Sequence, residues 1–320
     1  MRVFYPIALF LYGVTMLQGS DPGHDNLAPA TAALQAGQAD HAMELLNSLP
    51  QSAQVHNLKC RVQFTLDHWD AAAEECQQAV NMDGSNSDFH LWLGRALGER
   101  ADHASFMNAY SIGKRVGVEF EQSVQLNPRN AEALADLGEF DASAPGIVGG
   151  GTDKAQKVVD QLDKLDAARA EELRGRIADQ QKDFDAGEKH FKQAISESQR
   201  PEFQWMTLAS FYRRRQRWND LESAVENGFK AAQRDRRGGV ALFNGASALI
   251  RSNRNPALAV KLLETYLAGG YQTEEAPTFV AHTQLARLKA QLGDKQGARQ
   301  ERDAALALAH DYRPAQELKY

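Results

Sequence analysis

Cysteine is scarce in this chain, at two of 320 residues, and no cluster of cysteine and histidine has the spacing of a metal site. The nine histidines are scattered: no His-Glu-x-x-His pair occurs, and Asp102-His103 is a lone adjacent pair of the kind common in solvated loops. A Gly-x-Ser-x-Gly elbow is also absent. These absences predict a protein that is not an enzyme and uses no metal or cofactor.

A strong charge of one sign is also lacking. The formal net charge is -6 at pH 7, which provides no electrostatic attraction to nucleic acid, so no nucleic-acid partner is expected. The ten prolines and 24 glycines form no long low-complexity tract, and no convincing alternating strand pattern is present. With 43% hydrophobic and 24% charged residues, the composition is that of a folded domain.

The N-terminus is a separate segment. Arg2 precedes an uncharged apolar stretch over residues 3–17, and residues 20–23 (SDPG) break any helix. This is the plan of a secretory signal peptide, and the stretch is short for a membrane span. The sequence therefore predicts a signal peptide over 1–20, a linker over 21–25, and a periplasmic or secreted protein with no stable membrane span after signal removal. Leu17 is large for a position before cleavage at Gly19, so an uncleaved anchor or a buried helix is the alternative.

The rest of the chain contains an internal repeat. Residues 69–83 (WDAAAEECQQAVNMD) look like the second helix of a tetratricopeptide (TPR) unit, WLGRAL at 92–97 looks like the first helix of the next, and LNPRN at 126–130 closes that unit. On these segments the chain resembles the TPR family. The resemblance implies antiparallel helix pairs whose backbones come closest at one small residue on each helix, twelve positions apart.

Pairs with this separation recur at a period near the ~34 residues of a TPR unit. Ala209/Leu221 keeps the separation with a larger second residue, and two units starting from Gly94 and Gly138 contain insertions. The fold predicted is all-α: a right-handed superhelical solenoid of antiparallel helix pairs, with about eight degenerate TPR units over 26–310 and a tail or capping helix over 311–320. The remaining pairs are Ala30/Ala42, Cys60/Ala72, Gly175/Gly187, Gly245/Ala257 and Ala286/Ala298.

The two insertions allow more than one interpretation. Residues 99–118 form either a lengthened helix that packs on its neighbours or a protruding element that binds a partner. The second insertion, APGIVGGGTDK at 144–154, resembles the Ala-Pro-Gly-Ile-x-Gly-Gly turn of some bacterial exported TPR proteins. We expect it to be a turn between helices, with Thr152 or Asp153 capping the next helix. A partner-contacting loop is the alternative, whereas phosphate binding is disfavoured because no phosphate-loop spacing is present.

Cys60 and Cys76 lie on the two predicted helices of one unit. In an oxidising compartment they can form a disulfide, and otherwise they are two buried free thiols that act as small hydrophobic residues.

The TPR resemblance also implies a concave groove lined by the first helices. The run Arg213–Arg217 beside Phe203 and Met206 suits a peptide with an acidic group or a free C-terminus. Alternatively, these arginines pair with nearby acids or face water. The Lys and Asn set with which some TPR proteins clamp a carboxylate is absent. The groove residues predicted to contact a partner are Arg95, Arg176, Phe203, Met206, Arg213, Arg214, Arg217, Leu242 and Arg287.

The function predicted is that of a non-catalytic scaffold in the cell envelope that binds a protein or peptide through this groove. The alternative is a small-molecule carrier or an accessory subunit of a solute transport system, because Val148-Gly149-Gly150 faintly resembles a Leu-Gly-Gly-type loop of such TPR proteins. That alternative predicts a pore with an apolar lining. A third possibility is a structural role, in which exposed solenoid ends assemble copies of the chain.

Overall fold

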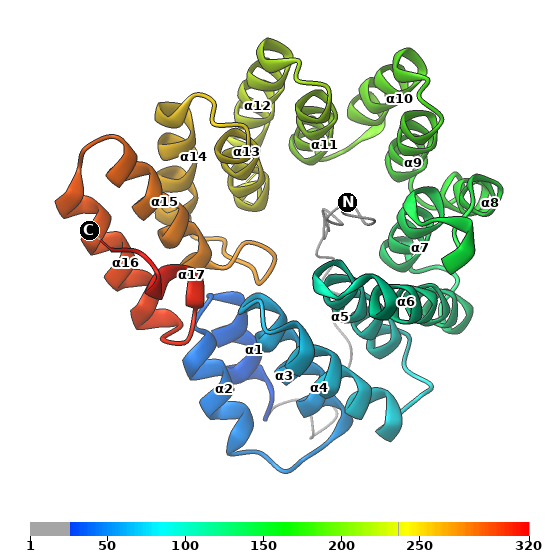
Figure 1. Cartoon of the computed structure of the whole chain (residues 1–320), viewed down its shortest axis with the longest axis horizontal. Helices are drawn as coiled ribbons and strands as arrows, with labels where there is room; N and C mark the ends of the chain where they lie inside the picture. The colour runs from blue at the N-terminus through cyan, green and yellow to red at the C-terminus, as the bar shows by residue number, and fades with distance from the viewer. Residues whose placement is uncertain (1–25, 236, 320) are drawn as a thin grey trace. The chain divides into compact units, whose positions relative to one another are not determined.

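The computed structural model describes residues 26–235 and 237–319, so the predicted signal peptide and linker lie outside the described residues. Over these ranges the chain forms seventeen α-helices, one 3₁₀ turn and no strand (Figure 1). The predicted all-α fold is confirmed. None of the helices in the part of the chain described has both the length and the apolar character needed to cross a membrane.

Helices α1 to α16 form eight consecutive pairs, and each helix makes its most extensive contact with its own partner. The pairs divide between two compact units, which we call the mid-chain unit (Leu49–Ser198) and the chain-end unit (residues 26–48 together with Gln199 onward). The mid-chain unit contains the pairs α3 (Ala53–Thr65) with α4 (Trp69–Met82), α5 (Ser87–His103) with α6 (Phe106–Leu126), α7 (Ala131–Ser143) with α8 (Thr152–Leu162), and α9 (Ala167–Gln180) with α10 (Phe184–Glu197).

The chain-end unit combines helices from both ends of the described chain. Its pairs are α1 (Ala28–Gln35) with α2 (Ala39–Asn47), α11 (Pro201–Arg214) with α12 (Trp218–Ala232), α13 (Gly239–Arg251) with α14 (Pro256–Ala268), and α15 (Thr278–Gln291) with α16 (Lys295–Leu308), followed by the short α17 (Arg313–Gln316).

Within the chain-end unit, the first pair packs against the last. Thr278 on α15 donates its hydroxyl hydrogen to the Ala36 carbonyl at 2.9 Å. The His310 backbone N–H and ring Nδ1 each lie 2.8 Å from a carboxylate oxygen of Asp40 on α2. Helix α2 also packs on α16. These two end pairs therefore cover each other, which disfavours assembly through free solenoid ends.

The small residues predicted at the helix crossings are buried in seven of the eight pairs, for example Ala42, Cys60 and Ala298, whose exposed fractions are all 0%. The pair Gly245/Ala257 is wrong by two residues. Helix α14 begins at Pro256, so Ala257 is exposed and Ala259, at 0% exposure, takes the crossing position. Its partner twelve positions earlier is Ser247.

Glycine is required at the crossing of the third pair. A Cβ atom added at Gly94 would lie 2.5 Å from the ring of Phe120 on α6, closer than side-chain carbons approach. Phe120 is itself fully buried, so its ring has no free space into which to move.

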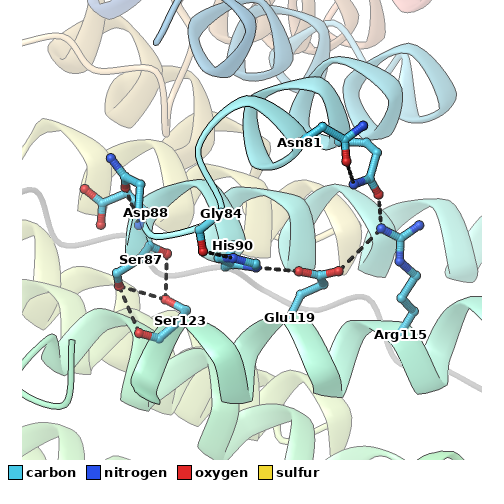
Figure 2. A network of polar contacts seen from close by, with 10 residues as sticks. Asn81, Gly84, Ser87, Asp88, His90, Arg115, Glu119 and Ser123 are labelled. Carbon is cyan, nitrogen blue, oxygen red and sulfur yellow. Dashed lines mark hydrogen bonds and ion pairs between the residues drawn. The ribbon is translucent and has the colours of Figure 1, made fainter. Parts of the chain in front are cut away.

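A histidine–glutamate contact joins the two helices in four of the pairs. His90 on α5 and Glu119 on α6 are both buried, with Nδ1 and Oε2 2.7 Å apart, and the His90 Nε2 lies 3.1 Å from the Gly84 carbonyl oxygen (Figure 2). The other contacts are His56–Glu75 at 2.6 Å, His190–Glu171 at 2.7 Å and His282–Glu301 at 2.6 Å.

These contacts occupy one repeated position. His56, His90 and His282 each stand four residues before the small crossing residue of the first helix, and Glu171 stands at the same place in its pair. Four of the nine histidines therefore belong to a repeated contact between paired helices, which their positions in the sequence did not reveal. In the other three pairs the two contact residues are 19 positions apart. In the third pair the insertion increases this separation to 29, so the repeat of the contact is not visible in the sequence.

The insertion in the third pair lengthens both of its helices around a short turn. The last turn of α5 packs on the start of α4, where the His103 ring stacks on Trp69 at 5.7 Å and Arg100 pairs with Asp70 at 2.6 Å. This matches the interpretation of a lengthened helix packed on its neighbours. On the α6 side of the turn, Met107 is 78% exposed.

The glycine-rich insertion is a compact turn in which the 3₁₀ turn η1 (Gly146–Val148) packs on α6. Gly149 has a φ of 110°, and a Cβ atom at Gly150 would lie 2.1 Å from the Ala144 carbonyl oxygen, so both positions need glycine. The predicted cap is wrong: the residue before α8 is Gly151, and neither Thr152 nor Asp153 caps the helix with its side chain.

Cys60 on α3 and Cys76 on α4 are bonded to each other, with their Cα atoms 5.1 Å apart. Both are fully buried, and the bond joins the two helices of the second pair. The alternative of two free thiols does not describe this structure.

Candidate functional site

The first helices α5, α7 and α9 of the mid-chain unit follow one another on one side of their pairs (Figure 1). Their side chains form a succession of ion pairs that we call the charged row. It consists of Arg95, Glu132, Asp136, Glu139, Arg169, Glu172 and Arg176.

Arg95 anchors the row from α5. Its side chain is 1% exposed, and it donates from Nε to Asp136 and from Nη2 to Glu132, both at 2.6 Å. Burial alone would lower the pKa of Arg95, but these two carboxylates outweigh it and raise the pKa, so the guanidinium stays charged. Arg95 was predicted to contact a partner. In the structure it is instead buried and links α5 to α7 through two ion pairs, because both of its carboxylate partners belong to the next pair.

Trp92 lies beside these ion pairs on α5. The guanidinium carbons of Arg61 and Arg95 lie 5.2 Å and 5.0 Å from the centre of its ring, within the range of a cation–π contact. Phe64 on α3 meets the same ring edge-on at 5.6 Å. The aromatic and charged contacts together hold α3, α5 and α7 in fixed register at this face.

A hollow opens on the charged row between α7 and α9. Arg176 reaches across it, donating to Glu139 on α7 and to Glu172 on its own helix, both at 2.9 Å. Arg176 is partly exposed here, so this predicted groove residue does face an open surface. Leu173 is the large apolar side chain among the residues that line the hollow, which are Ala135, Asp136, Glu139, Arg169, Glu172, Leu173 and Arg176.

In the chain-end unit, the predicted apolar shelf is not exposed. Phe203 and Met206 are 2% and 1% exposed, and Leu242 is also buried. The methyl end of Met206 points to Gly228 on α12 and Gly245 on α13, because glycine at both places leaves room for it. These three side chains therefore pack inside the unit and offer no surface to a partner.

The arginines of the run 213–217 have different environments. Arg217 pairs with Asp220 at 2.7 Å, and Arg215 lies over the Phe211 ring at 4.0 Å. Arg214 is exposed and Arg213 is half-buried. In the last pair, Arg287 is exposed and donates to the Pro314 carbonyl at 3.2 Å. The alternative interpretation, pairing with nearby acids, thus describes Arg217.

Two residues of these sites, one in each unit, were not found from the sequence. Asp136 was not predicted as the partner of Arg95, and Arg251 on α13 was not included in the groove. Both lie on first helices, so the helical period was a usable signal, but the choice of partner depends on how successive pairs pack.

Within the described residues no three histidine, cysteine, aspartate or glutamate side chains are grouped to hold a metal ion.

Comparison with known proteins finds no matching family model and no matching curated protein. Solved structures match at low identity. The Cut9–Hcn1 hetero-tetramer of the APC/C is 12% identical with a TM-score of 0.41, and the match covers 91% of this chain and 54% of that chain, about half its length. PilF of Pseudomonas aeruginosa is 15% identical with a TM-score of 0.38, covering 74% and 99% of the two chains. A TPR protein of Parabacteroides merdae is 13% identical with a TM-score of 0.39, covering 84% and 100%.

All three TM-scores are low, and the classification follows from the helix pairs themselves. Eight pairs in series, with small residues where their helices cross, are the architecture of a tetratricopeptide-type repeat protein. Solenoids of this type present extended surfaces on which other proteins bind.

Proposed function

We propose that this protein is a non-catalytic scaffold of the cell envelope that binds a polypeptide on the charged row of its mid-chain unit. The observation that carries the proposal is the hollow between α7 and α9, where donors and acceptors from two helices are already held in place by ion pairs. Side chains fixed before binding lose little conformational freedom when a partner arrives, which favours affinity.

The chemistry of the hollow suits a polar polypeptide chain better than an apolar small molecule. Carboxylates of Glu139 and Glu172 can accept from backbone N–H groups or from basic side chains, and Arg176 can donate to backbone carbonyls. The carrier alternative predicted an apolar lining, whereas this hollow is lined mainly by charged groups. The scaffold is therefore the better supported of the two proposals.

Location in the cell envelope is supported by the disulfide between Cys60 and Cys76, because such bonds persist in oxidising compartments and are rare in the cytosol. Alkaline phosphatase fused after residue 25 tests this directly. Phosphatase activity that depends on residues 1–20 is the expected result, and an inactive, cytosolic fusion would overturn the assignment.

Site-specific photo-crosslinking tests the binding surface. A benzoylphenylalanine placed at Ala135, which lines the hollow, is expected to form a discrete polypeptide adduct in the native host. The matched control is Gln156, an exposed position on the second helix α8 of the same pair. Adducts of equal yield at both positions, or none at Ala135, would contradict the proposed surface.

A further inference from the structure

The last turns of α11 and α13 each carry an arginine that has no carboxylate partner among the described residues. Arg213 is half-buried on α11, and Arg251 is exposed on α13. The two helices pack directly on each other. Arg213 stands four residues after Ala209 and Arg251 four residues after Ser247, so they occupy the same place in two successive pairs.

Positive charge is concentrated at this place. Burial, followed by the positive charges of Arg251 and Arg214 nearby, lowers the pKa of Arg213. Two carboxylates of α12 already have cationic partners: Glu222 pairs with Arg254 at 2.8 Å and Asp220 with Arg217 at 2.7 Å. An anion bound between Arg213 and Arg251 would therefore relieve their repulsion.

The charged row of the mid-chain unit differs in this respect. There Arg95 has two carboxylate partners, and Arg176 has two as well. Arginines that are satisfied internally hold a surface rigid, whereas arginines without a partner are free to bind one with the two parallel donors of a guanidinium fork.

We propose that Arg213 and Arg251 form a binding site for an acidic segment of a polypeptide. Neighbouring helices lie about 8–10 Å apart. A polyproline II chain has three residues per turn and rises about 3.1 Å per residue, so two carboxylates three residues apart lie on the same face of the bound segment and span about the same distance. The proposal rests on the proposed function, since it assigns acidic side chains to the polypeptide that this protein binds.

The test uses a labelled twelve-residue synthetic peptide with glutamate at every third position, and the same peptide with glutamine in its place. Fluorescence polarisation at low salt measures the affinity of the full mature chain. We expect the glutamate peptide to bind and Arg213→Gln with Arg251→Gln to weaken it at least tenfold. The control is Arg129→Gln with Arg234→Gln, two exposed arginines outside the site, which change net charge equally and should weaken binding less than twofold.

Several results would overturn the inference. These are no binding of the glutamate peptide, equal binding of the glutamine peptide, or equal weakening by the two double variants. Tighter, arginine-dependent binding of an oligothymidylate of the same charge would reassign the site to nucleic acid. Thermal melts of each variant check folding, and Arg213→Lys with Arg251→Lys, which keeps charge but loses the fork, should give an intermediate affinity.

Failure of this inference is distinguishable from failure of the proposed function. A cross-link at Ala135 together with peptide affinity unaffected by the arginine changes would leave the scaffold standing and remove the acidic-segment site. Arginine-dependent peptide binding without any adduct at Ala135 would support the acidic-segment site and contradict polypeptide binding on the charged row.

Discussion

At the scale of single residues, burial determines which charged groups hold the fold and which can meet a partner. Arg95 and Arg176 both stand directly after the small crossing residue of a first helix, yet Arg95 is buried and Arg176 is partly exposed on the hollow. The difference arises from the neighbouring pair, which places Glu132 and Asp136 around Arg95.

Loss of the Arg95 side chain should therefore act on stability. Arg95→Gln leaves Asp136 buried without its charged partner, and we expect the free energy of unfolding to fall by about 3–5 kcal/mol. Arg100→Gln is the control, because its ion pair with Asp70 is exposed and worth less than about 1 kcal/mol. Urea unfolding measures both, and equal losses would contradict the structural role of Arg95.

Asp141 predicts a pH dependence of stability. Asp141 is 3% exposed, its Oδ1 has no hydrogen-bond partner among the described residues, and burial raises the pKa of Asp141 from 3.8 to about 6. Between these pH values the folded state binds more protons than the unfolded state, so stability falls as pH rises from about 4 to 6.

Asp141→Asn should remove this loss. Above pH 6 the variant is expected to be more stable than the native chain, by at most about 3 kcal/mol, and the difference should vanish below about pH 4. Urea unfolding across this pH range measures it. Asp160→Asn on the exposed side of α8 is the control and should show no such trend; a constant difference at all pH values for Asp141→Asn would contradict the burial argument.

At the scale of helices, each pair is held by a close crossing and, in four pairs, by a histidine–glutamate contact near it. The contacts differ in exposure. His90 and Glu119 are both buried, whereas the His190 side chain is about one-third exposed, at 32%. Solvent screens the more exposed contact between His190 and Glu171, so this contact contributes less to the stability of the fold than the one between His90 and Glu119.

Double-mutant cycles on the two contacts measure this difference. Single and double alanine variants of His90 and Glu119 should give a coupling energy of about 1.5–3 kcal/mol, as for a charge-assisted hydrogen bond. The cycle for His190 and Glu171 should give less than about 1 kcal/mol. Equal coupling in the two cycles would show that burial does not control the strength of these contacts.

At the scale of the molecule, the described chain consists of two compact units, and the chain-end unit contains both the first and the last helix pairs. The first pair would otherwise present an uncovered face, as the terminal repeat of a solenoid does. Here α15, α16 and the residues after them supply contacts to α1 and α2.

Weakening these contacts should loosen the first pair selectively. Thr278→Val removes the hydrogen bond to Ala36, and Gln35→Ala removes the two hydrogen bonds that join Gln35 to Glu274. Amide hydrogen exchange in α1 and α2 is expected to become faster while exchange in α3 and α4 is unchanged, because the latter belong to the mid-chain unit. Thr265→Val, on an exposed site of α14, is the matched control. Unchanged exchange in α1 would contradict the docking of the first pair.

The all-α class and the succession of eight helix pairs could be predicted from the sequence alone. Small residues at helix crossings and helix-breaking residues between helices are local requirements, so they are visible as a period along the chain. The error at Gly245 and Ala257 has a local cause as well: Pro256 sets the start of α14, and the crossing position follows from that start.

Three features depend on the packing of successive helix pairs and could not be predicted from the sequence: which first-helix residues are buried, which acid pairs with which arginine, and where the first pair docks. Phe203 and Met206 fit the pattern of groove residues, but the packing of neighbouring helices buries them. Arg213 and Arg251 are 38 positions apart and come together because α11 packs on α13. Burial and charge pairing depend on contacts between residues distant in the chain, whereas a repeat pattern records what each helix pair needs within itself.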